Sequence, residues 1–150
     1  MQVINWNGGK YVLFYDTMTL NTEKFAKKVN KKYPQINICD IRAINSNYGY
    51  YQTIGTHPTE IEAHLVTYTI MQGEVPQTTL DFLEKYGWKN KIKTISSTGQ
   101  KNWGSDLFAK AVDVVNEKYP NIQKGLKIEL QGTAKDVNAM GRLILEGSNK

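Results

Sequence analysis

The chain has 150 residues, of which 40% are hydrophobic and 22% are charged. This composition is typical of a globular protein and excludes an intrinsically disordered one, and the length predicts one domain over residues 1–150. No apolar run approaches the roughly 20 residues that a transmembrane helix needs, so we expect no membrane association. The first ten residues lack the basic and apolar regions of a signal peptide.

The net charge of +5 is compatible with an acidic partner or an anionic ligand, although scattered lysines equally describe ordinary solvated surfaces. The sequence contains no nucleic-acid-binding motif and no basic stripe, so we expect no nucleic-acid partner. A single cysteine, Cys39, suits a reducing compartment, and we expect a cytoplasmic protein. Because Cys39 lies in the apolar run 36–41, it is predicted to be a buried structural thiol.

The first predicted elements are a strand and a helix. The unbroken apolar run 11–15 predicts a strand that is covered on both faces, as in a parallel sheet. Residues 7–9 before it form either a hairpin turn after a strand at 3–6 or part of a loose tail. A helix is predicted over 22–33, because apolar residues recur on one of its faces and Pro34 stops it.

The loop between these two elements is rich in hydroxyl groups. It contains Thr17, Thr19 and Thr22, together with Asn21. The free N–H groups and the positive dipole end of the following helix make this position suitable for a phosphate. Ordinary capping of the helix by Asn21 or Thr22 is the alternative interpretation.

Residues 36–41 predict a second strand, and the stretch 42–63 after it shows no helical period. We interpret this stretch as a long insertion loop or a projecting hairpin with its turn near 46–49. His57 and His64 lie near its end without a cysteine or carboxylate pattern, so they do not form a metal site and are predicted to be structural or surface residues.

The second half of the chain alternates between strands and helices. Apolar runs and turn residues predict strands at 65–69, 92–95 and 126–130, and helices at 76–86, 105–118 and 133–146. Gly87 closes the first of these helices, and Thr133 with Asp136 forms the capping signal of the last. Residues 147–150 are expected to be a loose tail.

This order of elements predicts an α/β fold with a parallel sheet and right-handed crossovers. Five strands in the order 2-1-3-4-5, covered by helices on both faces, give a flavodoxin-like three-layer sandwich. In this fold the ligand lies at the carboxyl ends of the strands. The loops after strands one, three and four, residues 16–22, 70–75 and 98–104, are therefore expected to converge on one site.

Several motifs carry a resemblance to a known family. They are Thr67-Tyr68-Thr69, Gly73-x-Val75-Pro76, Phe82-Leu83-Glu84-Lys85-Tyr86, Ser97-Thr98-Gly99-Gln100-Lys101-Asn102-Trp103-Gly104, Phe108-Ala109-Lys110-Ala111, and Glu129-Leu130-x-Gly132-Thr133 with Asp136-Val137. Together they resemble the NrdI family, the flavodoxin-like proteins that accompany class Ib ribonucleotide reductases. The resemblance runs from about Lys10 to Met140 and is strongest after Leu65.

The resemblance implies that the chain binds FMN non-covalently through the same three loops. Carried over by position, the cofactor-binding residues are Thr17, Met18, Thr19, Leu20, Asn21 and Thr22, then Ile70, Met71, Gln72 and Gly73, then Thr98, Gly99, Gln100, Asn102, Trp103 and Gly104. Trp103 either provides a plane for the flavin ring or anchors its loop to the domain. Because a flavin supplies its own redox chemistry, we expect no catalytic residue and no metal ligand.

The resemblance also implies a function. Reduced FMN would react with dioxygen, and the superoxide would pass to the dimanganese centre of the small reductase subunit and yield its tyrosyl radical. The protein would thus be an accessory flavoprotein that needs a flavin reductant, rather than a turnover enzyme. A general electron-transfer flavodoxin and a flavin-free interaction module remain as alternatives.

Two loops depart from the family pattern. Leu20 stands where the family has glycine, and Met71 and Gln72 stand where it has glycine and an aromatic residue. A side chain at position 20 would either obstruct the phosphate or force a backbone geometry that glycine adopts freely. These departures motivate the flavin-free alternative.

Overall fold

The computed structural model describes residues 4–5, 10–18, 20–42, 61–70 and 73–146. Within these ranges the strands are β1 (Ile4–Asn5), β2 (Tyr11–Tyr15), β3 (Ile36–Asp40), β4 (Glu62–Tyr68), β5 (Ile92–Gly99) and β6 (Gln123–Glu129). The α-helices are α1 (Asn21–Lys32), α4 (Gln77–Glu84), α5 (Ala111–Lys118) and α6 (Ala134–Glu146), and the short 3-10 helices are η2 (Trp88–Asn90) and η3 (Lys101–Trp103).

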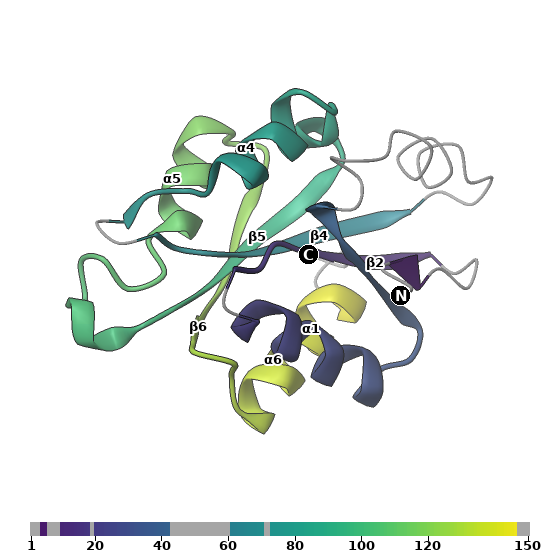
Figure 1. The fold of residues 1–150 in the computed structure, drawn as a ribbon. Coiled ribbons are helices and arrows are strands. Elements are labelled where there is room, and N and C mark those ends of the chain that lie inside the picture. The colour runs from purple at the N-terminus through teal and green to yellow at the C-terminus, as the bar shows by residue number, and fades with distance from the viewer. Residues whose placement is uncertain (1–3, 6–9, 19, 43–60, 71–72, 147–150) are drawn as a thin grey trace.

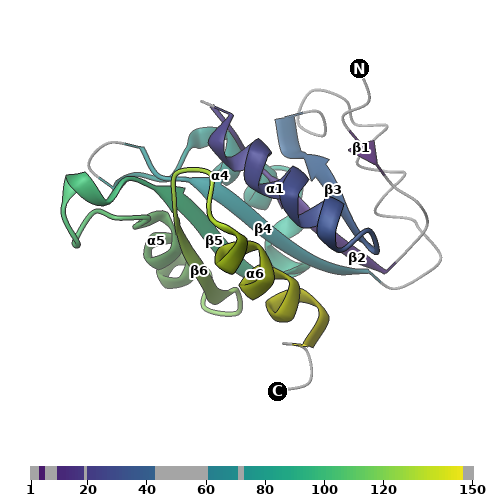
Figure 2. The ribbon, with the colours of Figure 1, turned by 90° about the horizontal axis from the view of Figure 1, so that it is seen from below.

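The described strands form one sheet in the order β1-β3-β2-β4-β5-β6. Strands β2 to β6 run parallel, and their order confirms the predicted 2-1-3-4-5 arrangement. Helices α1 and α6 cover one face of the sheet, and α4 and α5 cover the other (Figures 1 and 2). The flavodoxin-like three-layer architecture expected from the sequence is therefore present.

The N-terminal strand differs from both alternatives considered for it. Instead of forming a hairpin with β2 or a tail, β1 pairs antiparallel with β3, with Ile4 opposite Cys39 and Asn5 opposite Ile38. Without this partner β3 would be an edge strand with unpaired backbone N–H and C=O groups. β1 therefore provides hydrogen-bond partners for some of these groups. The turn predicted at 7–9 lies outside the described residues.

The other edge of the sheet is β6, which is protected differently. Most of its residues are exposed or half-buried. Lys124 and Lys127 on this strand form ion pairs with Asp113 of α5, at 3.0 and 2.7 Å. This edge strand therefore carries lysines that are paired with the neighbouring helix.

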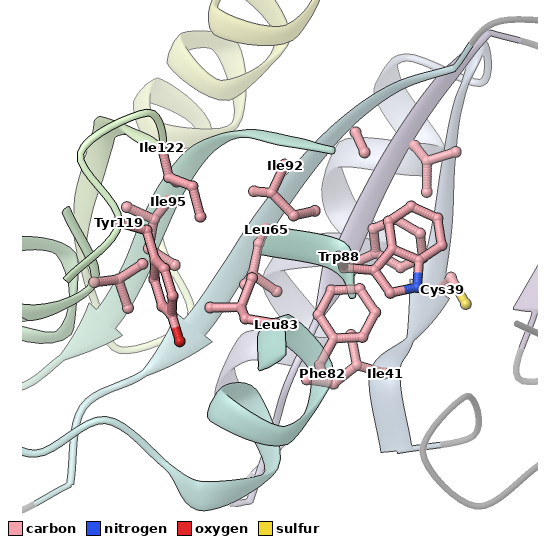
Figure 3. Close-up of a cluster of buried hydrophobic side chains, with 14 of the residues drawn as sticks. Cys39, Ile41, Leu65, Phe82, Leu83, Trp88, Ile92, Ile95, Tyr119 and Ile122 are labelled. Atoms are coloured by element: carbon pink, nitrogen blue, oxygen red, sulfur yellow. The ribbon is translucent and has the colours of Figure 1, made fainter. Parts of the chain in front are cut away.

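Two hydrophobic cores lie on the two faces of the sheet. The core under α1 and α6 contains Leu13, Phe25, Val29, Met140 and Ile144, among others. The core under α4 and α5 is built around Trp88, which is fully buried and stacks on Phe82 with ring centroids 5.5 Å apart (Figure 3). Cys39 belongs to this second core and is 2% exposed, so its predicted role as a buried thiol is confirmed.

Several strands and helices begin or end at residues other than those predicted. Strand β4 begins at Glu62 rather than Leu65, and β5 continues to Gly99 although its end is polar. Helix α5 begins at Ala111 rather than at residue 105, because Gly104 and Ala109 have φ values of 96° and 50°, which interrupt a right-handed helix. The prediction of a helix over 105–110 is therefore wrong.

The predicted start signal of α6 is confirmed. The carboxylate of Asp136 accepts hydrogen bonds from the backbone N–H of Thr133 at 2.8 Å and from its hydroxyl at 3.2 Å. The backbone N–H of Asp136 is also close to the Thr133 hydroxyl, at 3.4 Å. This reciprocal arrangement is the capping box that the sequence pattern predicts.

Leu20, the residue before α1, has a left-handed backbone with φ 71° and ψ −5°. This is the geometry that glycine adopts freely and that a leucine adopts at a cost of about 1–2 kcal/mol. Of the two consequences expected from a side chain at this position, the forced backbone geometry is observed. The side chain is 50% exposed, so little burial offsets the cost.

His64 is buried in β4 and is 3% exposed. Its Nδ1 lies 2.7 Å from the hydroxyl of Thr94 on β5, and its Nε2 has no hydrogen-bond partner among the described residues. Burial lowers the pKa of His64 to about 4, against the opposing effect of the nearby Glu62 carboxylate. The prediction of a structural histidine is confirmed, whereas His57 lies outside the described residues.

The buried His64 predicts a pH dependence of folding. As the pH falls from 6.5 towards 4, the unfolded chain binds a proton that the folded protein excludes, so the free energy of unfolding should fall; at pH 4.5 this loss is about 2.5 kcal/mol. The variant His64→Gln should lack it. Urea denaturation of both proteins at pH 7 and pH 4.5 measures the difference, and equal losses would contradict the prediction.

The strain at Leu20 predicts a stabilising substitution. Leu20→Gly should raise the free energy of unfolding by about 1 kcal/mol, because glycine removes the left-handed penalty at an exposed site. Leu20→Ala is the matched control, because it also shortens the side chain but keeps the penalty. Denaturant unfolding of the three proteins provides the test, and equal stability of the Gly and Ala variants would be evidence against strain.

Candidate functional site

Three loops meet at the carboxyl ends of β2, β4 and β5, as the order of elements predicts (Figure 1). The hydroxyl of Thr22, at the start of α1, lies 3.0 Å from the hydroxyl of Thr98, near the end of β5. The backbone N–H of Thr69, just after β4, donates to the carbonyl of Thr98 at 3.2 Å. The three loops are therefore joined by direct hydrogen bonds around Thr98.

The first loop contains polar groups that have no hydrogen-bond partner among the described residues. The hydroxyl of Thr17 is buried and has no hydrogen-bond partner among the described residues. Helix α1 has Leu20 at its N-cap position and no side-chain cap, so the proposed capping by Asn21 or Thr22 is wrong. A buried orphan hydroxyl beside an uncapped helix N-terminus is an arrangement that a bound anion would satisfy.

A directional chain of hydroxyl groups links the second and third loops. The Thr69 hydroxyl accepts a hydrogen bond from the backbone N–H of Ala111 at 3.1 Å, so its own proton is available to the hydroxyl of Ser97 at 2.9 Å. Ser97 in turn donates to the carbonyl of Thr98 at 2.9 Å. The start of α5 is thus fixed to the same residues that join the loops.

Two glycines allow these loops to pack closely. A Cβ on Gly99 would lie 2.8 Å from the backbone nitrogen of Ala109, and one on Gly73 would lie 2.8 Å from the side chain of Lys110. Gly73 also has φ 84°, which disfavours any other residue there. Both predicted positions therefore serve the close approach of the loops to residues 109–110.

Several predicted site residues form an exposed apolar rim around this edge. Met18 is 71% exposed, Leu20 is 50% exposed and Ile70 is 37% exposed. Leu130 after β6 is 46% exposed and donates its backbone N–H to the carbonyl of Gly99 at 2.9 Å. Within the described part of the chain, these four are the large hydrophobic side chains that are exposed.

The structure gives only backbone positions, or no position, for several other predicted site residues. Gln100 is the N-cap residue of η3, which holds the backbone of Asn102 and Trp103 and is followed by Gly104. Thr19, Met71 and Gln72 lie outside the described residues. The choice between a flavin plane and a loop anchor for Trp103 stays open, and a role in binding remains a prediction for all the site residues.

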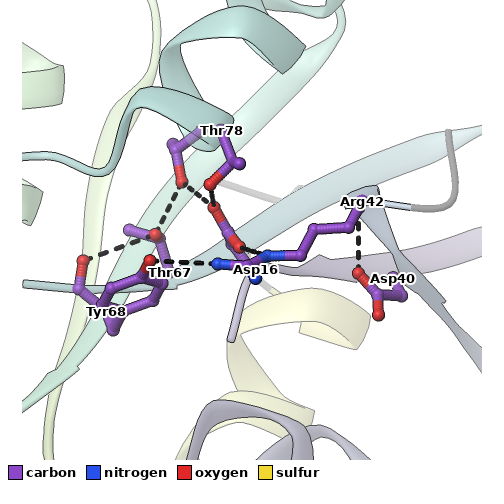
Figure 4. Close-up of polar contacts among 7 residues, drawn as sticks. Asp16, Asp40, Arg42, Thr67, Tyr68 and Thr78 are labelled. Atoms are coloured by element: carbon purple, nitrogen blue, oxygen red, sulfur yellow. Dashed lines mark hydrogen bonds and ion pairs between the residues drawn. The ribbon is translucent and has the colours of Figure 1, made fainter. Parts of the chain in front are cut away.

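The structure also contains a buried carboxylate, Asp16, directly after β2. The sequence analysis included residue 16 in the first loop but assigned no role to its side chain. Asp16 is fully buried and accepts hydrogen bonds from Arg42 Nε at 3.0 Å, from the Thr79 hydroxyl at 2.8 Å and from the Thr78 hydroxyl (Figure 4). The signal that could have revealed it is a charged residue directly after the apolar run 11–15, at the predicted binding edge.

Arg42 extends this network across the sheet. It follows β3, contacts Asp16 at the end of β2, and donates from Nη2 to the Tyr68 hydroxyl at the end of β4, at 3.1 Å. Its backbone N–H donates to Asp40 at 2.9 Å. Burial raises the pKa of the Tyr68 phenol, and the Asp16 carboxylate adds to this effect. Three neighbouring strands are thereby tied together beneath the first loop.

Two other kinds of feature are absent from the described residues. In this part of the chain, no group of three or more His, Cys, Asp or Glu side chains is arranged to hold a metal ion. None of the helices in these ranges combines the length and apolar character needed to cross a membrane.

Comparisons with known proteins agree with this architecture. The chain is 33% identical over 125 residues to the SPbeta prophage-derived protein NrdI of Bacillus subtilis (strain 168), covering 82% of each chain. It is 44% identical over 73 residues to protein NrdI of Bacillus licheniformis, covering 49% of this chain and 53% of that protein. A solved flavodoxin of Streptococcus pneumonia TIGR4 superposes with a TM-score of 0.63 at 21% identity, over 89% of this chain and 94% of that one.

The last comparison shows the shared fold, whereas family membership follows from sequence. The family described as NrdI Flavodoxin like matches residues 13–142. This range begins within β2 and ends within α6, and so includes all three loops of the candidate site. The chain therefore belongs to the NrdI flavodoxin-like family.

Proposed function

We propose that this protein binds FMN at the three-loop edge and, when the flavin is reduced, activates dioxygen for assembly of the dimanganese–tyrosyl radical cofactor in the small subunit of class Ib ribonucleotide reductase. Bound FMN would supply the electrons that convert dioxygen to superoxide. The observation that carries the proposal is the buried Thr17 hydroxyl, which has no partner among the described residues, in the loop that leads to the uncapped N-terminus of α1. It lies in the loop where this family is expected to hold the phosphate.

The residues of the site would bind and orient the cofactor. The Thr17 hydroxyl and the first N–H groups of α1 would donate hydrogen bonds to the phosphate. The loops after β4 and β5 would border the flavin ring, and the hydrogen bonds around Thr98 would keep them at a fixed spacing. A preorganised site of this kind loses less conformational entropy on binding than a mobile one.

The apolar rim supports a protein partner for the same edge. Met18, Leu20, Ile70 and Leu130 are all exposed there, and exposed apolar side chains gathered around a site are typical of protein contact surfaces. A small reductase subunit that docks on this rim would receive superoxide over a short path, with little loss to bulk water.

The phosphate site predicts two opposite effects of Thr17→Val. The flavin-free protein should become about 1 kcal/mol more stable, because a methyl group replaces a buried hydroxyl for which the described part of the chain offers no partner. FMN affinity should fall about tenfold, because a charge-assisted hydrogen bond is lost. Urea denaturation and flavin fluorescence titration measure the two effects, and unchanged affinities for both FMN and riboflavin would place the phosphate elsewhere.

Radical assembly tests the proposed activity directly. The FMN-loaded protein, reduced without oxygen and then mixed with air and the manganese-loaded small subunit, should generate a tyrosyl radical that electron paramagnetic resonance detects. The same mixture with flavin-free protein is the control. Absence of the radical, together with efficient electron transfer to a different redox protein, would support a general electron-transfer flavodoxin instead.

A further inference from the structure

Asp16 creates an electrostatic problem for the proposed phosphate site. Its carboxylate is fully buried and belongs to the residue directly before Thr17, whose hydroxyl is assigned to the phosphate. A negative charge close to a dianion opposes binding, and burial reduces the screening that water would provide. The donors Thr78 and Thr79 satisfy the carboxylate's hydrogen bonds but carry no charge.

Arg42 is placed to cancel that charge. Its Nε lies 3.0 Å from Asp16 Oδ1, and within the described ranges it is the cation that forms an ion pair with Asp16. The bond from Nη2 to the Tyr68 hydroxyl holds the other end of the guanidinium over β4 (Figure 4). Because β2 lies between β3 and β4, these two contacts fix the positive charge at the end of β2.

We propose that Arg42 is a positioning residue that neutralises Asp16, so that the loop after β2 accepts a doubly charged phosphate. The inference rests on the proposed FMN function and adds a residue that the family resemblance did not assign. A neutralising role of Arg42 differs from a purely structural role in one measurable way. Neutralisation affects the phosphate of FMN and leaves riboflavin, which carries the same ring without phosphate, unaffected.

The experiment compares the dissociation constants of FMN and riboflavin by fluorescence titration at low ionic strength. Arg42→Gln should weaken FMN binding about tenfold relative to riboflavin, because a charge near the phosphate becomes uncompensated. Arg42→Lys should keep the wild-type ratio. Added salt should reduce the difference between Arg42→Gln and the wild type, since screening weakens charge interactions.

Two further variants complete the design. Lys89→Gln is the matched control. Lys89 lies in η2, which precedes β5 and so lies at the opposite end of that strand from the site, and it forms a surface ion pair with Glu84 of α4. This variant also removes one positive charge, and it should leave the ratio of the FMN and riboflavin dissociation constants unchanged. Asp16→Asn should shift the ratio in favour of FMN by several fold, since it removes the opposing charge. This variant decides the matter if Arg42→Gln does not fold, because it leaves no buried charge without a partner.

The outcomes separate this inference from the proposed function. A wild-type protein that binds neither flavin would overturn the FMN proposal itself. A wild-type protein that binds both, with Arg42→Gln weakening both equally or neither, would overturn only the neutralising role. An unchanged ratio of the FMN and riboflavin dissociation constants in Asp16→Asn would also overturn the neutralising role of Arg42.

Discussion

A hydrogen bond between two buried threonines joins α1 to β5 at the carboxyl edge of the sheet. Thr22 begins α1, Thr98 nearly ends β5, and their hydroxyls lie 3.0 Å apart although 76 residues separate them. Parallel strands bring their carboxyl ends to one edge, but that arrangement alone does not set the distance between loops. The Thr22–Thr98 contact adds a direct link between two of these segments, and the chain from Ala111 through Thr69 and Ser97 extends it to α5.

The same edge carries unfavourable features that the rest of the fold tolerates. Leu20 adopts a left-handed backbone, the Thr17 hydroxyl is buried without a partner among the described residues, and Asp16 is a fully buried charge. Strain and unsatisfied groups tend to gather where a protein binds a ligand, because the surrounding structure sustains them. Their occurrence together at Asp16, Thr17 and Leu20 favours a loop shaped for binding.

Local sequence pattern predicted the layers, the five parallel strands and the convergence of the loops, because burial on both faces leaves continuous apolar runs. It did not predict the pairing of β1 with β3 or the contact between Asp16 and Arg42, since both depend on segments that meet only after folding. The polar end of β5 resembles a loop in sequence, yet Ser96, Ser97 and Thr98 are buried strand residues whose hydroxyls have partners. The interruption before α5 was missed because Ala109 gives no sign of its positive φ.

The two borders of the sheet have consequences for how copies of the protein meet. β1 occupies one border through its pairing with β3, while β6 forms the other and carries Lys124 and Lys127, both paired with Asp113. A second molecule that added its own strand to β6 would have to accommodate these ion pairs and bring like charges together. Paired lysines on an edge strand of this kind hinder the sheet from growing into a continuous ribbon through β6.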